Sequence, residues 1–212
     1  MADSEKIDLY KQYKDQYAAP KSPVLVTLDQ VRYLCISGRG APGGPEFKDK
    51  VGALYGAAYT IKMTRKFASL QDYVICKLEA QWWLDGGKQD FADVPREQWN
   101  WKLMIRTPEV VGEDELQRAQ SVLTQKGKSP RVSEVKLETI REGLCVQMLH
   151  VGPYEQENRT IAVMEDFAAQ QGMGFHGLHH EIYLSDPRRV PPERLKTILR
   201  HPVTKKDHRS SK

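Results

Sequence analysis

The chain has 212 residues, of which 40% are hydrophobic and 28% charged, and its formal net charge is +4. This length fits one domain, or two small halves that share a core, and the composition is ordinary for a globular protein. The excess of basic residues is small and lies mostly in the last eight positions, without interleaved aromatic rings, so we do not expect a nucleic-acid interface. No apolar run approaches the ~20 residues that span a bilayer.

The cysteines and the first twenty residues indicate the cellular compartment of the protein. Cys35, Cys76 and Cys145 lie far apart in apolar, strand-like stretches, and they form no Cys-x-x-Cys pair. This pattern is typical of small buried hydrophobic residues in a reducing compartment. The first twenty residues are charged and Tyr-rich and do not resemble a signal peptide. We therefore expect a cytoplasmic protein.

Hydrophobic periodicity and chain breakers predict an alternation of strands and helices. Residues 1–23 form an N-terminal helical extension in this interpretation, and Pro20 and Pro23 end it. The first half then contains strands at 24–28, 31–37, 73–83 and 99–107, with helices at 46–66 and 113–125. The second half contains strands at 132–140, 144–150, 176–185 and 195–200, with a helix at 155–171. Residues 204–212 are predicted to be a basic, disordered tail.

An internal repeat links the two halves. The segment 102–108, Lys-Leu-Met-Ile-Arg-Thr-Pro, matches the segment 196–202, Lys-Thr-Ile-Leu-Arg-His-Pro, in its Lys, Arg and Pro positions. We therefore predict an α+β fold of duplicated β-α-β-β units, at about 24–112 and 130–203, with pseudo-two-fold symmetry. Helices would cover antiparallel sheets, and a central cleft between the halves would bind the ligand.

Glu181 is the leading candidate for a functional residue. It lies in the middle of an apolar strand, and His179 and Tyr183 project to the same face. Burying a charged carboxylate costs several kcal/mol, so Glu181 should be protonated, hydrogen-bonded or matched by a ligand cation. The alternative is a Glu at a sheet edge that faces water or pairs with a nearby His or Arg.

We predict no metal site and no cofactor from the histidines around Glu181. His179 and His180 are adjacent, so they point to opposite faces of a strand. Acidic or thiol ligands do not accompany them at the spacing of known zinc sites. His179 remains a candidate ligand-binding residue through its pairing with Glu181.

Four tryptophans are candidates to line the cavity. Trp82 and Trp83 should point to opposite faces of a strand, so that only one of them lines the cavity. Trp99 and Trp101 share a face and are predicted to form a flat stacking wall, which attracts cations. Core packing is the alternative for each of them.

Two tyrosines, one glutamate and a turn complete the predicted site. Tyr55 and Tyr59 lie one helical turn apart and are expected to close the cavity, although ordinary helix packing explains them almost as well. Glu79 is placed at a position comparable to that of Glu181, with pairing to Lys77 as the alternative. Tyr154 follows Gly-Pro and is expected to hold its hydroxyl over the cavity mouth.

Several of these segments together resemble the GyrI-like small-molecule-binding proteins, in their stand-alone branch. The similarity rests on Leu78-Glu79, Trp82-Trp83, the run from Trp99 to Arg106 with Pro108, His150-Val151-Gly152-Pro153-Tyr154, the run from His180 to Pro187, and Thr197-Ile198-Leu199-Arg200. The resemblance implies a duplicated, SHS2-like β-α-β-β fold with a central cavity. Related domains sense drugs in multidrug transcription activators, where a buried Glu meets lipophilic cations between aromatic rings. Other relatives inhibit DNA gyrase, and some stand-alone members hydrolyse the cyclopropane of DNA-alkylating natural products.

Two functions follow from this resemblance, and the sequence leaves both open. In the first, the protein binds lipophilic or cationic aromatic molecules in a Trp/Tyr-lined cavity with Glu181 as the anchor, in a role in drug resistance. In the alternative, it is a cyclopropanoid hydrolase in which Glu181 assists the attack of water and a hydroxyl of Tyr183 or Tyr154 polarises the substrate carbonyl. A gyrase inhibitor is disfavoured, because a net charge of +4 does not mimic DNA. The chain shows no N-terminal helix-turn-helix, so a DNA-binding regulator is not expected.

Overall fold

The computed structural model describes residues 6–87, 91 and 93–206, and its contacts divide them into two units. The first unit contains the residues up to Lys14 together with Val31–Ile140. The second contains Asp15–Gln30 together with the residues from Arg141 onward.

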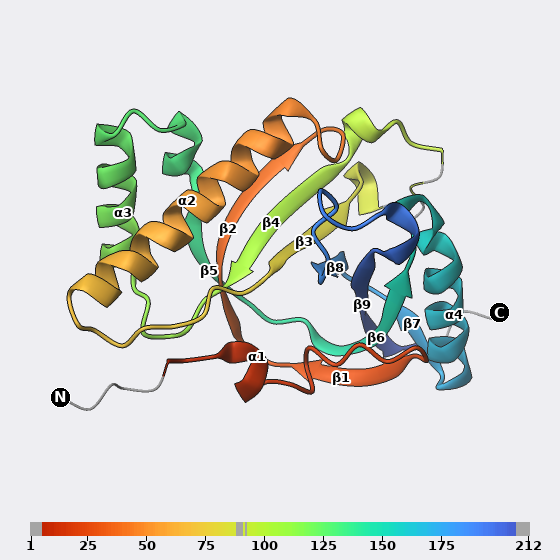
Figure 1. The fold of residues 1–212 in the computed structure, drawn as a ribbon. Coiled ribbons are helices and arrows are strands. Elements are labelled where there is room, and N and C mark those ends of the chain that lie inside the picture. Colours follow the sequence, from red (N-terminus) through yellow and green to blue (C-terminus); the bar gives the residue numbers. More distant parts are fainter. Residues whose placement is uncertain (1–5, 88–90, 92, 207–212) are drawn as a thin grey trace. The chain divides into compact units, whose positions relative to one another are not determined.

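The first unit is an antiparallel sheet with helices against it (Figure 1). Its strands lie in the order β3-β4-β2-β5. The elements are α1 (Leu9–Gln12), β2 (Val31–Arg39), α2 (Pro45–Phe67), β3 (Leu78–Trp83), β4 (Asn100–Arg106), α3 (Glu113–Gln125) and β5 (Lys136–Ile140), with short 3-10 turns at Asp85–Gly87, Arg96–Gln98 and Pro130–Glu134.

Helix α2 covers one face of this sheet, which we call the α2 face. Pro45 occupies its first turn, where a missing N–H costs nothing. Small and aliphatic residues then recur at helical spacing and are buried: Ala53, Leu54, Ala57, Ala58 and Ile61. They pack against alternate residues of the strands, whose side chains point to the α2 face. These residues are Leu34, Ile36, Leu78, Ala80, Trp82, Trp101, Leu103 and Ile105. Helix α3 packs on α2 in turn.

The second unit is also an antiparallel sheet with one long helix. Its strands lie in the order β1-β6-β9-β8, and β7 pairs with β9. The elements are β1 (Val24–Leu28), β6 (Gly143–Val151), α4 (Glu157–Gln170), β7 (Met173–Phe175), β8 (His179–Tyr183) and β9 (Lys196–Lys205), with 3-10 turns at Tyr154–Gln156 and Pro192–Arg194.

Helix α4 covers one face of this second sheet, which we call the α4 face. Met164 and Ala168 of α4 form a buried cluster with Val146 of β6 and Leu199 of β9. Cross-strand partners project to the same side of a sheet. The register therefore places on the α4 face the residues Val146, Met148, His150, His179, Glu181, Tyr183, Thr197, Leu199 and His201.

The two units share one order of elements and one order of strands. In the first, the β-α-β-β order is β2-α2-β3-β4 and the strands lie as β3-β4-β2. In the second, the order is β6-α4-β8-β9, with the three-residue strand β7 inserted after α4, and the strands lie as β8-β9-β6. The repeated motif aligns as well, because Arg106 lies opposite Tyr33 and Arg200 lies opposite Gln147. The predicted α+β fold with antiparallel sheets and repeated β-α-β-β order is confirmed.

The outermost strands differ from the predicted halves. Strand β1 directly precedes β2 in sequence but pairs with β6, and β5 directly precedes β6 but pairs with β2. Each unit thus takes its outer strand from the sequence that leads into the other unit. The contacts therefore do not divide the chain into the predicted contiguous halves at 24–112 and 130–203.

Several predicted boundaries also move. The N-terminal helix is only four residues long, with Asp8 as its N-cap, and the strand predicted at 73–83 begins at Leu78. Strand β9 continues through Thr204 to Lys205 because it pairs with β7 there, so these two residues do not belong to the tail predicted at 204–212. Residues 207–212 lie outside the described residues.

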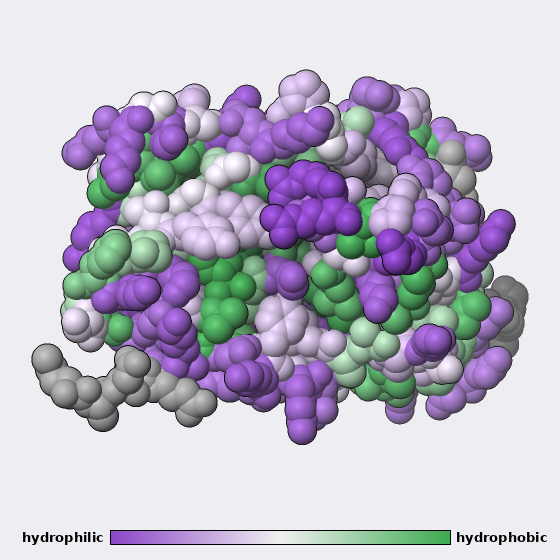
Figure 2. Space-filling view, viewed as in Figure 1, coloured by the Kyte–Doolittle hydropathy of each residue, from purple (hydrophilic) through white to green (hydrophobic). Residues whose placement is uncertain are grey.

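The surface carries mostly polar side chains. Figure 2 shows hydrophilic residues over most of the visible face, with smaller hydrophobic areas between them. Among the described residues, no helix is both long enough and apolar enough to span a lipid bilayer.

Candidate functional site

The site is built around Glu181, the central residue of β8. Glu181 lies opposite Leu199 of β9, and it is 8% exposed. Its side chain is on the α4 face, together with those of His179 and Tyr183, because residues two apart on a strand share a face. The sequence prediction of a buried carboxylate on an apolar strand is therefore confirmed.

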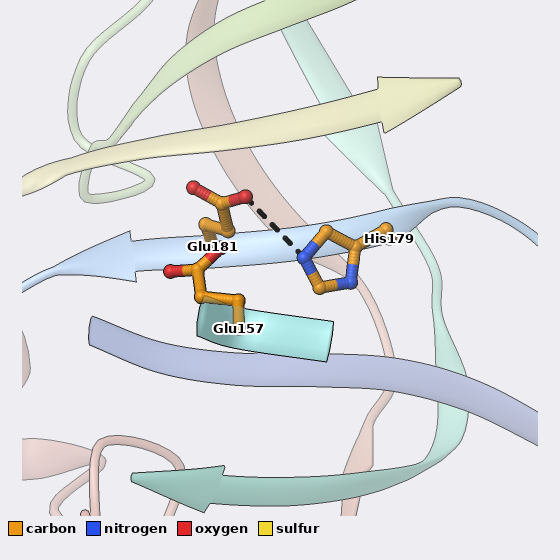
Figure 3. Close-up of side chains that lie close together, drawn as sticks. All are labelled: Glu157, His179 and Glu181. Atoms are coloured by element: carbon orange, nitrogen blue, oxygen red, sulfur yellow. Dashed lines mark ion pairs between the residues drawn. The ribbon is translucent and has the colours of Figure 1, made fainter. Parts of the chain in front are cut away.

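A second carboxylate meets Glu181 from the helix. Glu157 is the first residue of α4, and it reaches across to β8 (Figure 3). One donor atom each from Glu157, His179 and Glu181 lie within 4.8 Å of one another. The Nε2 atom of His179 is 3.3 Å from Oε1 of Glu181, in ion-pair range but outside hydrogen-bond geometry. We call these three residues the Glu-His-Glu cluster.

The cluster is buried and incompletely paired. Burial, followed by the charge of Glu181, raises the pKa of Glu157 well above its ordinary value. The structure gives no hydrogen-bond partner to Oε1 of Glu157, to Nε2 of His179 or to Oγ1 of Thr197. These are three of only six such buried side-chain atoms among the described residues, and all three lie on the α4 face or in the helix that covers it. Unpaired buried polar atoms are rare in folded proteins, so these three atoms set the α4 face apart from the rest of the described residues.

Two tyrosine rings border the cluster. The rings of Tyr154 and Tyr183 meet edge to face, with centroids 6.0 Å apart. Burial and the nearby charge of Glu181 raise the pKa of Tyr154 to about 12, so its hydroxyl keeps its proton at neutral pH. A protonated phenol is a hydrogen-bond donor beside a carboxylate.

The turn that carries Tyr154 is fixed by His150. The Nε2 atom of His150 donates to the carbonyl oxygen of Pro153 at 3.1 Å, and its Nδ1 atom accepts from the hydroxyl of Thr160 at 2.9 Å. The carbonyl can only accept, so this pairing assigns the proton to Nε2. Gly152 has φ of 140°, a conformation that side chains other than hydrogen rarely adopt. The sequence therefore specifies this turn through both Gly152 and His150.

A further histidine lies beside the cluster on the same face. The ring of His201 stacks on Phe175, with centroids 4.1 Å apart, and its centroid is 5.9 Å from that of His179. Burial, followed by the charge of His179, lowers the pKa of His201 to about 3. His201 is thus a neutral wall of the site.

The other face of the same sheet holds a separate network of charged groups. Nδ1 of His180 lies 3.0 Å from both carboxylate oxygens of Glu142, and Arg200 lies 3.6 Å from Glu142. Arg200 also donates to Gln147 at 2.9 Å. His179 and His180 do point to opposite faces, as predicted. Each histidine nevertheless has an acidic partner, Glu181 for His179 and Glu142 for His180. The pairing of His179 with Glu181 was predicted, whereas that of His180 with Glu142 was not.

The predicted tryptophans gather in the first unit. Trp82 and Trp101 both pack on Phe47 of α2, stacked at 6.0 Å and edge-on at 5.1 Å respectively. Trp99 meets Trp82 edge to face at 81°. Trp99, which precedes β4, thus contacts Trp82, and Trp101 within β4 contacts Phe47. Both contacts are edge to face and differ from the flat stacking predicted for Trp99 and Trp101. The Nε1 atom of Trp82 is buried without a hydrogen-bond partner, and Trp83 is less buried than Trp82.

The remaining predicted residues lie elsewhere in the first unit. Tyr55 and Tyr59 are neighbours on α2, with ring centroids 6.2 Å apart, but Tyr59 is 54% exposed. Glu79 is fully buried and accepts a hydrogen bond from the hydroxyl of Tyr33 at 3.2 Å. Glu79 lies opposite Met104, which corresponds to Ile198, so its counterpart in the second unit is Ile182. The predicted equivalence of Glu79 and Glu181 is wrong by one residue, and the two side chains occupy opposite faces of their sheets.

Comparison with known proteins identifies the family. A model of the GyrI-like small-molecule-binding domain matches residues 101–204. A crystal structure described as an uncharacterised conserved protein from Listeria innocua is 40% identical, covers 94% of this chain and 100% of its own, and superposes with a TM-score of 0.87. The chain belongs to the GyrI-like small-molecule-binding family.

Other solved structures extend the comparison. A crystal structure described as a hydrolase from Listeria innocua is 38% identical, covers 94% of this chain and 100% of its own, and has a TM-score of 0.84. The C-terminal domain of EcmrR is 9% identical and shares only the fold, with a TM-score of 0.56 over 87% of this chain and 98% of its own. A search of curated proteins gives no significant match.

Within the family frame, the structure brings together part of the predicted site. Glu181, Tyr183, Tyr154 and His179 lie close to one another in the second unit. Glu157 belongs with them and was not predicted, because it is distant in sequence and looks like an ordinary acidic residue in the first turn of a helix. The only sign of this role in the sequence was the position of Glu157 just after the Gly-Pro-Tyr turn, from which it faces β8.

Proposed function

We propose that this GyrI-like protein binds a small, mostly apolar electrophile at Glu181 and adds water to it. The observation that carries the proposal is the Glu181 carboxylate, held by His179 and bordered by the hydroxyl-bearing rings of Tyr154 and Tyr183 on one face of one sheet. A base beside a hydrogen-bond donor is what general acid–base hydrolysis requires. The 38%-identical relative described as a hydrolase supports the same class of reaction.

The cyclopropane-bearing DNA alkylators implied by the sequence resemblance are the first substrates to test. In the proposed reaction, Glu181 accepts a proton from water while the water oxygen bonds to a ring carbon. The adjacent carbon–carbon bond of the cyclopropane breaks, and its electron pair moves into the conjugated carbonyl. The hydroxyl of Tyr154 donates a hydrogen bond to that carbonyl oxygen, which then receives the proton from Glu181. The sum is substrate plus one water.

The mutational test compares two buried glutamates. Glu181→Gln should lower the rate of water addition by about 100-fold or more, the usual contribution of a general base. Glu142→Gln is the matched control, since Glu142 is an equally buried partner of a histidine on the opposite face. Mass spectrometry in ¹⁸O-labelled water measures the product. Equal rates in Glu181→Gln and wild type, or no labelled product above background, would reject the proposal.

Sequestration of lipophilic cations is the second candidate, and one observation favours it. Two buried carboxyl groups lie together in the second unit, where the rings of Tyr154 and Tyr183 also lie, and aromatic faces attract cations. Titration with a rhodamine-type dye tests it, with a dissociation constant in the micromolar range expected, about −8 kcal/mol. Unchanged affinity in Glu181→Gln would remove the anchoring role.

A further inference from the structure

We propose that Glu157, His179 and Glu181 form a binding site for one divalent metal ion, with Zn²⁺ as the best fit. This binding goes beyond the proposed function, none of whose steps uses a metal ion. None of the comparisons assigns such a site to this fold.

The donor atoms suit a transition metal. The cluster offers one imidazole nitrogen and two carboxylates, from two different elements, with donor atoms within 4.8 Å of one another (Figure 3). An ion at about 2.0–2.2 Å from each donor would need only small side-chain rotations to bring them together. Three protein ligands leave a coordination position free for water, as in catalytic rather than structural zinc sites. Imidazole with carboxylates favours Zn²⁺ over Mg²⁺ or Ca²⁺.

Two buried atoms of the cluster lack hydrogen-bond partners, and this favours a bound ion. Glu157 is 7% exposed and His179 is 9% exposed, yet neither Oε1 of Glu157 nor Nε2 of His179 has a hydrogen-bond partner. Figure 3 shows the side chains of Glu157 and His179 next to the carboxylate of Glu181. An ion bound among these three side chains would give both atoms a partner and would balance the negative charge of the cluster.

A third buried atom without a hydrogen-bond partner lies on the same face of the sheet. Thr197 is 1% exposed, and its Oγ1 atom has no hydrogen-bond partner either. The register puts Thr197 on the α4 face, between His150 of β6 and Tyr183 of β8. Thr197 thus adds a further unpaired polar atom to the face that carries the Glu-His-Glu cluster.

On the opposite face of the same sheet, a buried carboxylate is paired with both a histidine and an arginine. Glu142 has His180 at 3.0 Å and the guanidinium of Arg200 at 3.6 Å, so the chain supplies its own cation. Among the described residues, no Lys or Arg lies in ion-pair range of Glu157 or Glu181. The Glu-His-Glu cluster thus lacks the cation that its counterpart contains.

The test is a metal titration of the EDTA-stripped full chain. Co²⁺ serves as the spectroscopic probe for a zinc site, and calorimetry follows Zn²⁺ itself. We expect one equivalent of Co²⁺ to bind with a visible d–d absorption band. Glu157→Gln and His179→Gln should each weaken binding by roughly 100-fold or more, beyond the 10–100-fold typical of losing an outer-shell partner. Glu142→Gln should leave the affinity unchanged.

The outcomes separate the two proposals. Absence of saturable binding, or binding as tight in Glu157→Gln and His179→Gln as in wild type, overturns the metal site. If one of these variants fails to fold, as circular dichroism would show, the other still decides. Hydrolysis that persists in stripped protein without metal binding would leave the proposed function standing alone. Metal binding with the expected variant pattern, but no labelled product, would keep the site and reject hydrolysis.

Discussion

The α2 face and the α4 face occupy the same place in two units of the same topology, yet they differ chemically. The register aligns Ile36, Leu78, Ala80 and Leu103 of the first unit with His150, Glu181, Tyr183 and Thr197 of the second. Four apolar positions thus correspond to four polar ones. The α2 face is a packed core, whereas the α4 face carries buried polar groups at the corresponding positions. The proposed function of this protein therefore lies where the two units differ.

The largest effect should come from making Glu181 resemble its counterpart Leu78. Glu181→Leu should lower the rate of water addition by about 100-fold or more, because it removes the general base. The free energy of unfolding should stay the same or rise, since a buried carboxylate is replaced by an apolar side chain. Activity assays and urea unfolding measure the two quantities. A variant that loses stability but retains activity would contradict the comparison.

The reverse exchange should damage the first unit. Leu103 is fully buried on the α2 face, and Leu103→Thr removes packing and adds a hydroxyl without a partner. We expect a loss of about 3 kcal/mol in the free energy of unfolding. Chemical denaturation measures it. A loss near zero would show that the α2 face tolerates polar groups and is not a core.

Local patterns predicted much of this architecture. Strand β1 at 24–28 and helix α3 at 113–125 have the predicted bounds, because strict apolar periodicity ends at Pro, Gly or Asp there. The exchange of β1 and β5 was not predictable, since it depends on pairing between distant segments. Register is equally non-local, and this is why Glu79 was misaligned with Glu181. Glu157 joins the site only through the packing of α4 on β8.

Acidification should weaken the α4 face through His201. Its folded pKa is about 3, against 6.5 for the free side chain. The unfolded chain takes up this proton as the pH falls below about 6.5, whereas the folded protein resists until about pH 3. Stability is therefore fully present above pH 6.5 and is lost through this window, by about 2–3 kcal/mol at pH 4.5.

His201→Phe provides the control for that pH dependence. The variant keeps a ring to stack on Phe175 but cannot take up a proton. Urea unfolding at pH 7 and pH 4.5, in the presence of EDTA, should show a smaller loss on acidification in the variant than in wild type. Parallel losses in both proteins would rule out His201 as the source.

The smallest expected effect is a gain. Thr197→Val should raise the free energy of unfolding of the metal-free protein by about 1 kcal/mol, because the buried hydroxyl has no partner. Thermal unfolding detects a change of this size. A clear loss of stability would mean that the hydroxyl makes a contact that the α4 face needs.

The most direct measurement is a crystal structure of Glu181→Gln with an uncleaved cyclopropane-bearing substrate. Substrate density should contact residue 181 and the rings of Tyr154 and Tyr183, on the α4 face. Well-defined substrate density that touches none of these side chains would contradict the assignment of the functional site to the second unit.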